Sequence, residues 1–322
     1  MYAYILKRMF FTIPILFGVN LITFSLFFIV NTPDDIARIH LGDKYTTEVE
    51  IANWKKNHGY HLPLFYNKEN RSFKETIFFQ QSIKLFSFNY GISDTGRNIA
   101  HDLSSRYKPS IMLALPSLII GLWLNVLFAM FMAFFKNSYI DVISITICVV
   151  MMSVSVIFYI ISCQLLFSKV LKWVPISGYL TGASATKFII LPLLVSVLTG
   201  LGSGARWYRT FFIDELYKDY VLTCKAKGLN NSIILFKHVL KNAIIPILTG
   251  IVVILPLLFM GSLVLESFFA IPGLGSYTID AIRAQDFAIV KTMVFLGSIL
   301  YILGLLLTDI TYIIVDPRIK LG

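Results

Sequence analysis

Uncharged apolar runs long enough to cross a lipid bilayer are the feature that most constrains this chain. The first extends over residues 9–33, and five more follow it. A bilayer core about 30 Å thick needs roughly 20 apolar helical residues, and backbone groups in lipid must bond within their own helix. Barrel strands alternate in hydrophobicity, which these runs do not. We therefore predict an all-α membrane protein with six transmembrane helices, at residues 9–33, 109–135, 142–168, 188–205, 243–265 and 292–315.

The composition agrees with this class of protein. Of the 322 residues, 57% are hydrophobic and 14% are charged, whereas about a quarter of the residues in an average soluble domain are charged. This deficit excludes a soluble enzyme, a disordered protein and a nucleic-acid-binding domain. The formal net charge of +10 therefore has to be sorted by the side of the membrane on which it lies, and membrane lipid, not nucleic acid, is the expected partner.

The positions of Lys and Arg predict the orientation of the helices. With a cytoplasmic N-terminus, twelve of the 28 Lys and Arg residues lie inside and five lie in the two short outside loops. The others fall in a long outside segment, where the charge rule is weak. Both termini are therefore predicted to be cytoplasmic. Lys7 and Arg8 resemble the start of a signal peptide, but the apolar run is too long and no small-residue cleavage site follows before Asn31, so we expect a retained first helix.

The spans divide the chain into three parts: residues 1–33 with the first helix, an external segment at residues 34–108, and a five-helix core at residues 109–322. The external segment is mixed in charge and rich in aromatic residues. It is too long for a bare loop, so we predict short helices that lie against the outer membrane face. His58 and His61 could form a metal pair, but without a Cys or a carboxylate cluster nearby they are predicted to be ordinary loop residues.

The predicted cytoplasmic loop at residues 206–242, called the basic loop below, carries seven Lys and Arg residues. A short helix up to Lys227 would end with Gly228 in the left-handed cap conformation. Asn231 or Ser232 would cap a second helix that runs into the fifth span, with Pro246 near the join. That helix would have Ile233, Ile234, Phe236, Val239 and Leu240 on its apolar side, and Lys237, His238 and Lys241 on the other. Two interpretations remain open: a compact helix–turn–helix that stands off the membrane, and a positive-inside loop held by anionic lipid.

Acidic residues inside spans usually mark function. Asp309 is the only acid well inside a predicted span, but it lies seven residues before Asp316, about 10 Å along a helix, and hence near the cytoplasmic end. We expect it to pair with an Arg or Lys of a loop or with helix-terminal N–H groups, and a proton relay is the alternative. Glu266 lies at the outer end of the fifth span, from which it can reach the interface.

Several motifs of enzymes and carriers are missing from the sequence. It has no G-x-x-x-x-G-K-[ST] phosphate loop, nucleophile elbow, H-E-x-x-H motif or pair of intramembrane carboxylates. No internal repeat of the kind found in secondary transporters relates its two halves. These absences argue against an enzyme and against a self-sufficient channel or proton-coupled carrier. Energy for the transport of a solute is expected to come from another protein.

Six stretches, in the right order, resemble the permease subunits of bacterial peptide ABC importers of the DppB/OppB type, over nearly the whole chain. Five of them are residues 266–275, 283–286, 316–319 and 174–178 and the first residues, which end at Arg8; residues 212–215 also resemble Yej-type peptide importers. The basic loop is similar to the conserved cytoplasmic "EAA" region of the family at Asp219, Tyr220, Thr223, Cys224, Lys225, Ala226, Lys227, Gly228, His238, Asn242 and Pro246. Cys224 stands where the family usually has Ala, and Lys225 where Arg is common.

The resemblance implies a type I ABC importer permease fold in the bacterial inner membrane, forming half of the path for di- or oligopeptides. It implies that the short helix of the basic loop docks in a groove of a cytoplasmic ATPase. The expected partners are a second homologous permease, two ATPases that bind ATP and Mg, and an external solute-binding protein, with no cofactor on this chain. Import of nickel chelates or other small solutes is the alternative within the family. Structural or gating roles are expected at Arg209, Glu266, Pro272, Gly273, Gly275, Asp286, Asp309, Asp316 and Arg318.

Overall fold

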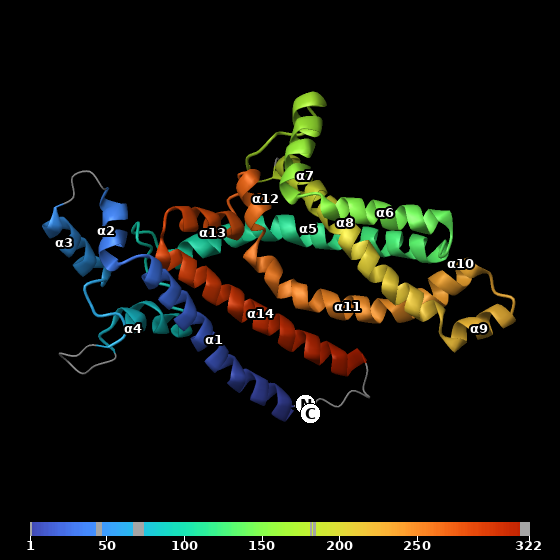
Figure 1. Ribbon diagram of the computed structural model, residues 1–322, viewed down its shortest axis with the longest axis horizontal. Coiled ribbons are helices and arrows are strands. Elements are labelled where there is room, and N and C mark those ends of the chain that lie inside the picture. Colours follow the sequence, from blue (N-terminus) through green and yellow to red (C-terminus); the bar gives the residue numbers. More distant parts are fainter. Residues whose placement is uncertain (1, 43–46, 67–73, 181, 183–184, 316–322) are drawn as a thin grey trace. The chain divides into compact units, whose positions relative to one another are not determined.

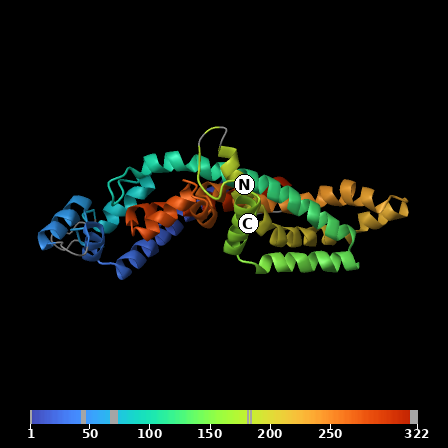
Figure 2. The same cartoon turned by 90° about the horizontal axis from the view of Figure 1, so that it is seen from above.

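The computed structural model describes the chain apart from residues 1, 43–46, 67–73, 181, 183–184 and 316–322. The described residues form helices and one isolated antiparallel bridge between Ile92 and Asn98, without a strand. Figures 1 and 2 show the order of the helices along the chain. The described residues of Met1–Tyr107 and Tyr277–Leu306 make one compact unit, and those of Lys108–Ser276 and Leu307–Lys320 make a second.

Among the described residues, five helices are long and apolar enough to cross a membrane. They lie at Phe10–Val30, Ile99–Phe134, Ala185–Leu216, Asn231–Phe268 and Phe287–Thr311. A bent pair of helices, Tyr139–Ser153 and Val156–Val170, passes as a sixth span if it is counted as one. The prediction of an all-α membrane protein is therefore confirmed for the described residues, with five spans, or the six that were predicted if the bent pair is the third.

The first unit contains the short helices that were predicted for the external segment. Its helices include α1 (Tyr2–Val30), α2 (Pro33–Leu41), α3 (Glu48–His58), α4 (Ile77–Gln81) and the 3-10 helix η1 (Ile83–Ser87). Thr32 and Thr47 start α2 and α3 with capping boxes, in which the carboxylates of Asp35 and Glu50 accept from the cap backbone. The core of this unit is aromatic and includes Phe24, Trp54, Tyr60, Phe78 and Phe287.

The helix α5 (Ile99–Phe134) begins ten residues before the predicted start of the second span. Asn98 caps it, because the Oδ1 atom of Asn98 accepts from the N–H of His101 at 3.2 Å. Asp102 lies in the first turn, where a negative charge favours the helix. The polar residues before the apolar run are therefore helical as well, and Pro109 lies inside the helix and not at its start.

The third span is not the single helix that was predicted at residues 142–168. It consists of α6 (Tyr139–Ser153) and α7 (Val156–Cys163), continued by the π-helix η2 (Gln164–Val170), with a bend of 92°. Val154 is extended at the bend, with ψ 130°. The hydroxyl of Tyr159 donates to the Met151 carbonyl at 3.0 Å, and this bond satisfies an acceptor that the interrupted helix leaves open.

The fourth span, α8 (Ala185–Leu216), continues beyond its predicted end at residue 205. Gly202 and Gly204 do not end the helix but allow close contacts. A Cβ at Gly202 would lie 2.7 Å from the Cys148 carbonyl oxygen, and a Cβ at Gly204 would lie 2.5 Å from Nδ2 of Asn125. The glycines thus let α8 approach α6 and α5, and this packing offsets their low helix propensity. Figures 1 and 2 both show α6 and α8 side by side.

The fifth span is interrupted where a single helix over residues 243–265 was predicted. Before the break the elements are α9 (Asp219–Ala226), α10 (Asn231–Ile233), the π-helix η4 (Ile234–Val239) and α11 (Leu240–Leu257). The 3-10 turn η5 (Leu258–Met260) and Gly261, with φ 70°, then separate α11 from α12 (Leu263–Phe268). The left-handed glycine cannot continue a right-handed helix, and Pro256 in the last turn of α11 provides no N–H donor.

The helices α13 (Leu274–Arg283) and α14 (Phe287–Val315) follow. The last helix starts five residues before the predicted sixth span, which began at residue 292. Asp286 caps this start, because its Oδ1 accepts from the N–H of Ile289 at 3.2 Å. Lys291 therefore lies within the helix and not in the loop before it.

Candidate functional site

The turn in the basic loop has the conformation that the sequence predicts. Gly228 follows α9 and has φ 76°. Its N–H donates to the Lys225 carbonyl at 2.9 Å, and the N–H of Leu229 donates to the Cys224 carbonyl at 3.2 Å. These two bonds make a Schellman motif. A Cβ at Gly228 would meet no atom within 4 Å, so the left-handed backbone alone favours glycine here.

The helix after this turn starts differently from the prediction. Asn231 or Ser232 was expected to be the N-cap, but Asn230 takes this position, with ψ 145°. Its carbonyl accepts from the N–H of Ile234 at 3.0 Å, whereas its side chain makes no cap bond. The prediction relied on side-chain capping, and backbone conformation determines the start instead. From Asn231 the chain stays helical as far as Leu257.

The basic loop packs firmly onto the helices of the second unit. Its buried side chains join a core with those of α8, and this core includes Tyr208, Phe212, Val221, Ile234, Leu235 and Val239. Ile233 and Phe236 were predicted to lie on the apolar side, but they are 46% and 59% exposed. Phe236 lies in the π-helix η4, whose wider turn changes the direction of successive side chains relative to an α-helix, whereas Ile233 lies just before it. The loop is therefore a fixed part of this unit with some apolar side chains facing outward.

The outward face of α9 carries most of the residues that the resemblance singled out. Leu222 is 62% exposed on this helix. The exposed residues in and just after α9 also include Asp219, Thr223, Lys225, Ala226, Lys227 and Gly228. Cys224 and His238 are partly buried, and Pro246 lies within α11. The face thus presents one large apolar side chain surrounded by small, polar and basic ones.

A hydrogen-bond network joins α9 to both neighbouring helices. The hydroxyl of Tyr220 donates to Oε2 of Glu215 at 2.8 Å and also bonds to the side chain of Asn242. Lys218 donates to the other oxygen of Glu215 at 2.5 Å. Burial raises the pKa of Tyr220 to about 12, and the bond to Glu215 acts in the same direction. Tyr220 and Asn242 were predicted site residues. Glu215 was not, although it belongs to residues 212–215, which resemble Yej-type peptide importers.

The carboxylate of Glu266 is fully buried between backbone donors. It accepts from the N–H groups of Gly275 and Ser276 at 2.7 and 3.1 Å and from that of Ser262 at 3.1 Å. The hydroxyl of Ser110, on α5, also bonds to it. Two of these donors belong to the first turn of α13, whose positive end stabilises a negative charge. The prediction that Glu266 reaches the interface is therefore wrong, because these donors hold it inside the protein.

Gly273 leaves the space that this carboxylate needs, and Gly275 lets α13 approach the backbone at the start of α12. A Cβ at Gly273 would collide with the carboxylate of Glu266 and with the hydroxyl of Ser110. A Cβ at Gly275 would lie 2.6 Å from the carbonyl carbon of Ser262. Pro272 is exposed in the turn before α13. The stretch at residues 266–275, which the sequence singled out, is thus a buried cap that ties α12, α13 and α5 together.

Arg209 forms a bidentate ion pair between α8 and α6. Its Nε and Nη2 atoms donate to the two carboxylate oxygens of Asp141 at 3.0 and 2.7 Å. Asp141 is buried in the first turn of α6 and also accepts from the N–H of Asn137 at 3.2 Å. Such paired, planar contacts fix the relative position of two helices. Arg209 was a predicted site residue, and Asp141 was missed because it lies just before the predicted third span.

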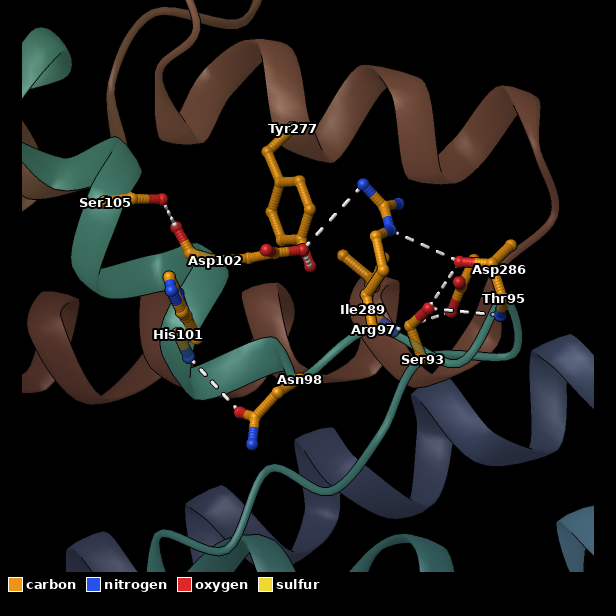
Figure 3. Close-up of polar contacts among 10 residues, drawn as sticks. All are labelled: Ser93, Thr95, Arg97, Asn98, His101, Asp102, Ser105, Tyr277, Asp286 and Ile289. Carbon is orange, nitrogen blue, oxygen red and sulfur yellow. Dashed lines mark hydrogen bonds and ion pairs between the residues drawn. The ribbon is translucent and has the colours of Figure 1, made fainter.

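Figure 3 shows a polar group in the first unit that was not predicted, in which Tyr277 points toward Asp102. The Tyr277 hydroxyl donates to Oδ2 of Asp102 at 3.0 Å, and the guanidinium of Arg97 lies 3.8 Å from the same oxygen. Arg106 lies over the Tyr277 ring at 4.7 Å from the centroid. Burial raises the pKa of Tyr277, and the hydrogen bond to Asp102 raises it further.

Two acids and a lysine are buried in the same part of the first unit. Asp94, Asp286 and Lys291 are 7%, 1% and 4% exposed. Asp94 accepts from the N–H of Phe287 at 3.1 Å, and Lys291 donates to Gln81. Burial and the negative charge of Asp286 raise the pKa of Asp94, while the positive charge of Lys291 opposes this change. The sequence predicted a role for Asp286 only, because Asp94 is far away in the sequence and Lys291 was placed in an outside loop.

The remaining predicted residues have less to add. Asp309 is partly buried in α14, six residues before the end of this helix at Val315. Asp316 and Arg318 lie outside the described residues. His58 stacks on Trp54 with ring centroids 4.2 Å apart. In the described part of the chain, no group of three or more His, Cys, Asp or Glu residues is placed to hold a metal ion.

The known proteins that this chain resembles are membrane proteins, in agreement with its membrane-length helices. The family described as binding-protein-dependent transport system inner membrane component matches residues 125–321. The glutathione transport system permease protein GsiC of Escherichia coli (strain K12) is 28% identical over 321 residues, or 99% of each chain. The probable peptide ABC transporter permease protein y4tP of Sinorhizobium fredii is 31% identical over 325 residues, also 99% of each chain. The chain, with its membrane-length helices, therefore belongs to the inner membrane components of binding-protein-dependent transport systems.

Proposed function

We propose that this chain is the permease subunit of an ATP-driven importer of di- or oligopeptides, and that α9 couples it to a cytoplasmic ATPase. It forms half of the solute path together with a second, similar permease. ATP and Mg²⁺ bind to two ATPase partners, and a solute-binding protein delivers the peptide from outside. The chain itself carries out no catalysis and binds no cofactor.

The observation that carries this proposal is the two-sided character of α9. Val221 on its inner side is 1% exposed, whereas Leu222 on its outer side is 62% exposed. The inner side belongs to the core that contains α8 and η4, so a force on the outer side acts on the membrane helices as well. A helix held in this way transmits rigid-body movement, which a loop held only by lipid does not.

Peptides are the proposed solute because of the named relatives. One is named as a probable peptide permease and another as a glutathione permease, and glutathione is itself a small peptide. Both match over 99% of this chain. The similarity therefore includes the external segment and every span, and no feature of the described residues favours nickel chelates over peptides.

The coupling role can be tested at the outer face of α9. Leu222→Glu places a charge where an apolar contact with the ATPase is expected, while Val221 and the packed side of the helix stay unchanged. Ile39→Glu on α2 is the matched control, since Ile39 is also exposed, at 46%, but belongs to the external segment. We expect Leu222→Glu to lose ATPase co-purification and peptide uptake at normal membrane levels. Equal ATPase binding by both variants would contradict the coupling role.

The energy source is tested in vesicles that contain the complete complex. Uptake of labelled trialanine should require ATP and stop when the catalytic residue of the partner ATPase is replaced. Uptake that continues without ATP and follows an imposed proton gradient would support the proton-coupled carrier instead. Uptake of a nickel chelate but of no peptide would leave the permease role intact and contradict the proposed solute.

A further inference from the structure

A cavity lies beside the break in the fifth span, within the second unit. Its volume is about 280 Å³, and its walls include Leu113, Leu257 and Leu265 together with the hydroxyl side chains of Ser117, Ser196 and Ser262. No charged side chain contributes to its lining. A water molecule occupies about 30 Å³ in the liquid, so the cavity has room for roughly nine waters or for part of a small organic molecule.

The break at Gly261 lies beside this cavity, and its N–H groups are bonded within the protein: that of Gly261 to the Leu258 carbonyl at 3.3 Å and that of Ser262 to Glu266 at 3.1 Å. Backbone that leaves the helix at membrane depth exposes N–H and C=O groups that lipid cannot satisfy. Such breaks are tolerated where the backbone is buried in protein or lines a cavity, and interrupted helices commonly mark solute sites in transporters. Gly261 and Ser262, at the break itself, both line the cavity. Polar backbone and three serine hydroxyls thus share one otherwise apolar space.

The two walls at the break are held in different ways. On one side, Ser262 donates its N–H to Glu266, whose carboxylate is bound to the backbone of α13. On the other side, Leu257 ends α11, which continues without interruption from η4 of the basic loop. One wall is therefore fixed by a buried carboxylate, and the other is continuous with the loop that we assign to the ATPase contact.

We infer that this cavity contacts the peptide during transport and receives one uncharged side chain with its adjoining peptide group. This inference rests on the proposed function. The apolar walls match an aliphatic or aromatic side chain, and the hydroxyls of Ser117, Ser196 and Ser262 match a peptide N–H or C=O. The volume suits one residue and not a whole peptide, so the rest of the solute lies outside this cavity. Movement of α11 against the fixed wall changes the space available to that residue.

Cysteine labelling tests whether the peptide enters the cavity. Ser196→Cys is introduced into a chain carrying Cys224→Ser, because Cys148 and Cys163 are buried. The assembled complex is treated with a water-soluble maleimide with and without saturating trialanine. The control is Thr210→Cys, an exposed position on the same helix, fourteen residues or about 21 Å away. We expect trialanine to slow labelling at position 196 about tenfold and to leave labelling at position 210 unchanged.

A second pair of variants tests the size of the cavity. Ser196→Phe should reduce uptake of triphenylalanine at least fivefold more than uptake of trialanine, because the added ring takes up space that the larger peptide needs. Ile190→Phe, at an exposed position of α8 outside the cavity, should leave both uptakes unchanged.

Two labelling results would overturn the inference if the parent complex takes up trialanine. In the first, the maleimide does not label the cysteine at position 196; in the second, it labels this cysteine at the same rate with and without trialanine. Equal loss of both peptides in Ser196→Phe would overturn it too. No ATP-dependent uptake of either peptide by the parent would contradict the proposed function instead.

Discussion

Substitution of Gly228 tests whether the left-handed turn after α9 keeps the coupling helix in shape. A residue with a side chain at φ 76° costs roughly 1–2 kcal/mol more than glycine. No collision adds to this cost, because a Cβ would meet no atom within 4 Å. One or two kcal/mol is about a 5–30-fold change in an equilibrium. In Gly228→Ala the last turn of α9 should therefore be open about 5–30 times more often, and Gly228→Val should be worse because β-branched residues tolerate this region poorly.

The assay is ATPase co-purification and peptide uptake at matched membrane levels. Both should decline in the order parent, Gly228→Asn, Gly228→Ala, Gly228→Val, because Asn adopts the left-handed conformation more readily than other residues with side chains. Gly200→Ala is the matched control, since a Cβ there also meets no atom within 4 Å but the backbone is helical. A valine variant that binds the ATPase and transports like the parent would refute the role of the turn. Equal losses for Asn and Val would show that backbone strain is not the cause.

Three further perturbations test other parts of the chain. Glu266→Gln should lower the unfolding free energy by about 3 kcal/mol, because bonds to a buried charge contribute roughly 1.5–3 kcal/mol each; an unchanged thermal unfolding midpoint would contradict this. Lys291→Met should cost about 3–5 kcal/mol by leaving two buried acids without their cation, and adding Asp94→Asn should recover part of the loss in the same unfolding measurement. Hydrogen bonds from the capping threonines lower the pKa values of Asp35 and Glu50, so their stabilisation is present at neutral pH and is lost as the pH falls below about 4. The protection of the amides in the first turns of α2 and α3, measured relative to their intrinsic exchange rates at each pH, should therefore fall on acidification in the parent but not in the Asp35→Asn and Glu50→Gln variant.

The sequence predicts the fold class because membrane spans depend mainly on local hydrophobicity. A run of apolar residues has one stable backbone solution in lipid, so the number of spans follows from the runs themselves. Gly228 is similarly local: a glycine after a short polar helix indicates a left-handed cap, and its φ of 76° confirms this. In both cases the deciding interactions lie within a few residues of the position concerned.

The breaks and buried charges depend on contacts between distant residues, and the sequence predicts them poorly. The bend at Val154 has no proline or glycine to announce it, and one of its freed acceptors is satisfied by Tyr159. Glu266 was predicted to be interfacial because the sequence does not indicate its hydrogen-bond donors. These donors belong to α13, nine and ten residues later, and to Ser262. Asp94 is even further from the residue whose N–H it accepts, because the two are 193 positions apart.

Gly228 and Gly261 both have positive φ and lie just beyond the two ends of one helical element. Each end can therefore be perturbed separately by a substitution. Asn231 to Leu257 is helical throughout, about 40 Å at 1.5 Å per residue, which exceeds the thickness of a bilayer core. At the first end, a side chain added at position 228 meets no neighbour. The effect of such a substitution is therefore confined to the turn and to the ATPase contact proposed for α9. At the second end, a side chain added at position 261 would collide with Glu266 and with Ser110. Such a substitution therefore disturbs the fixed wall of the cavity. Loss of ATPase binding and loss of solute contact should therefore map to opposite ends of this element, because the helix between them is continuous and each end has its own local constraint.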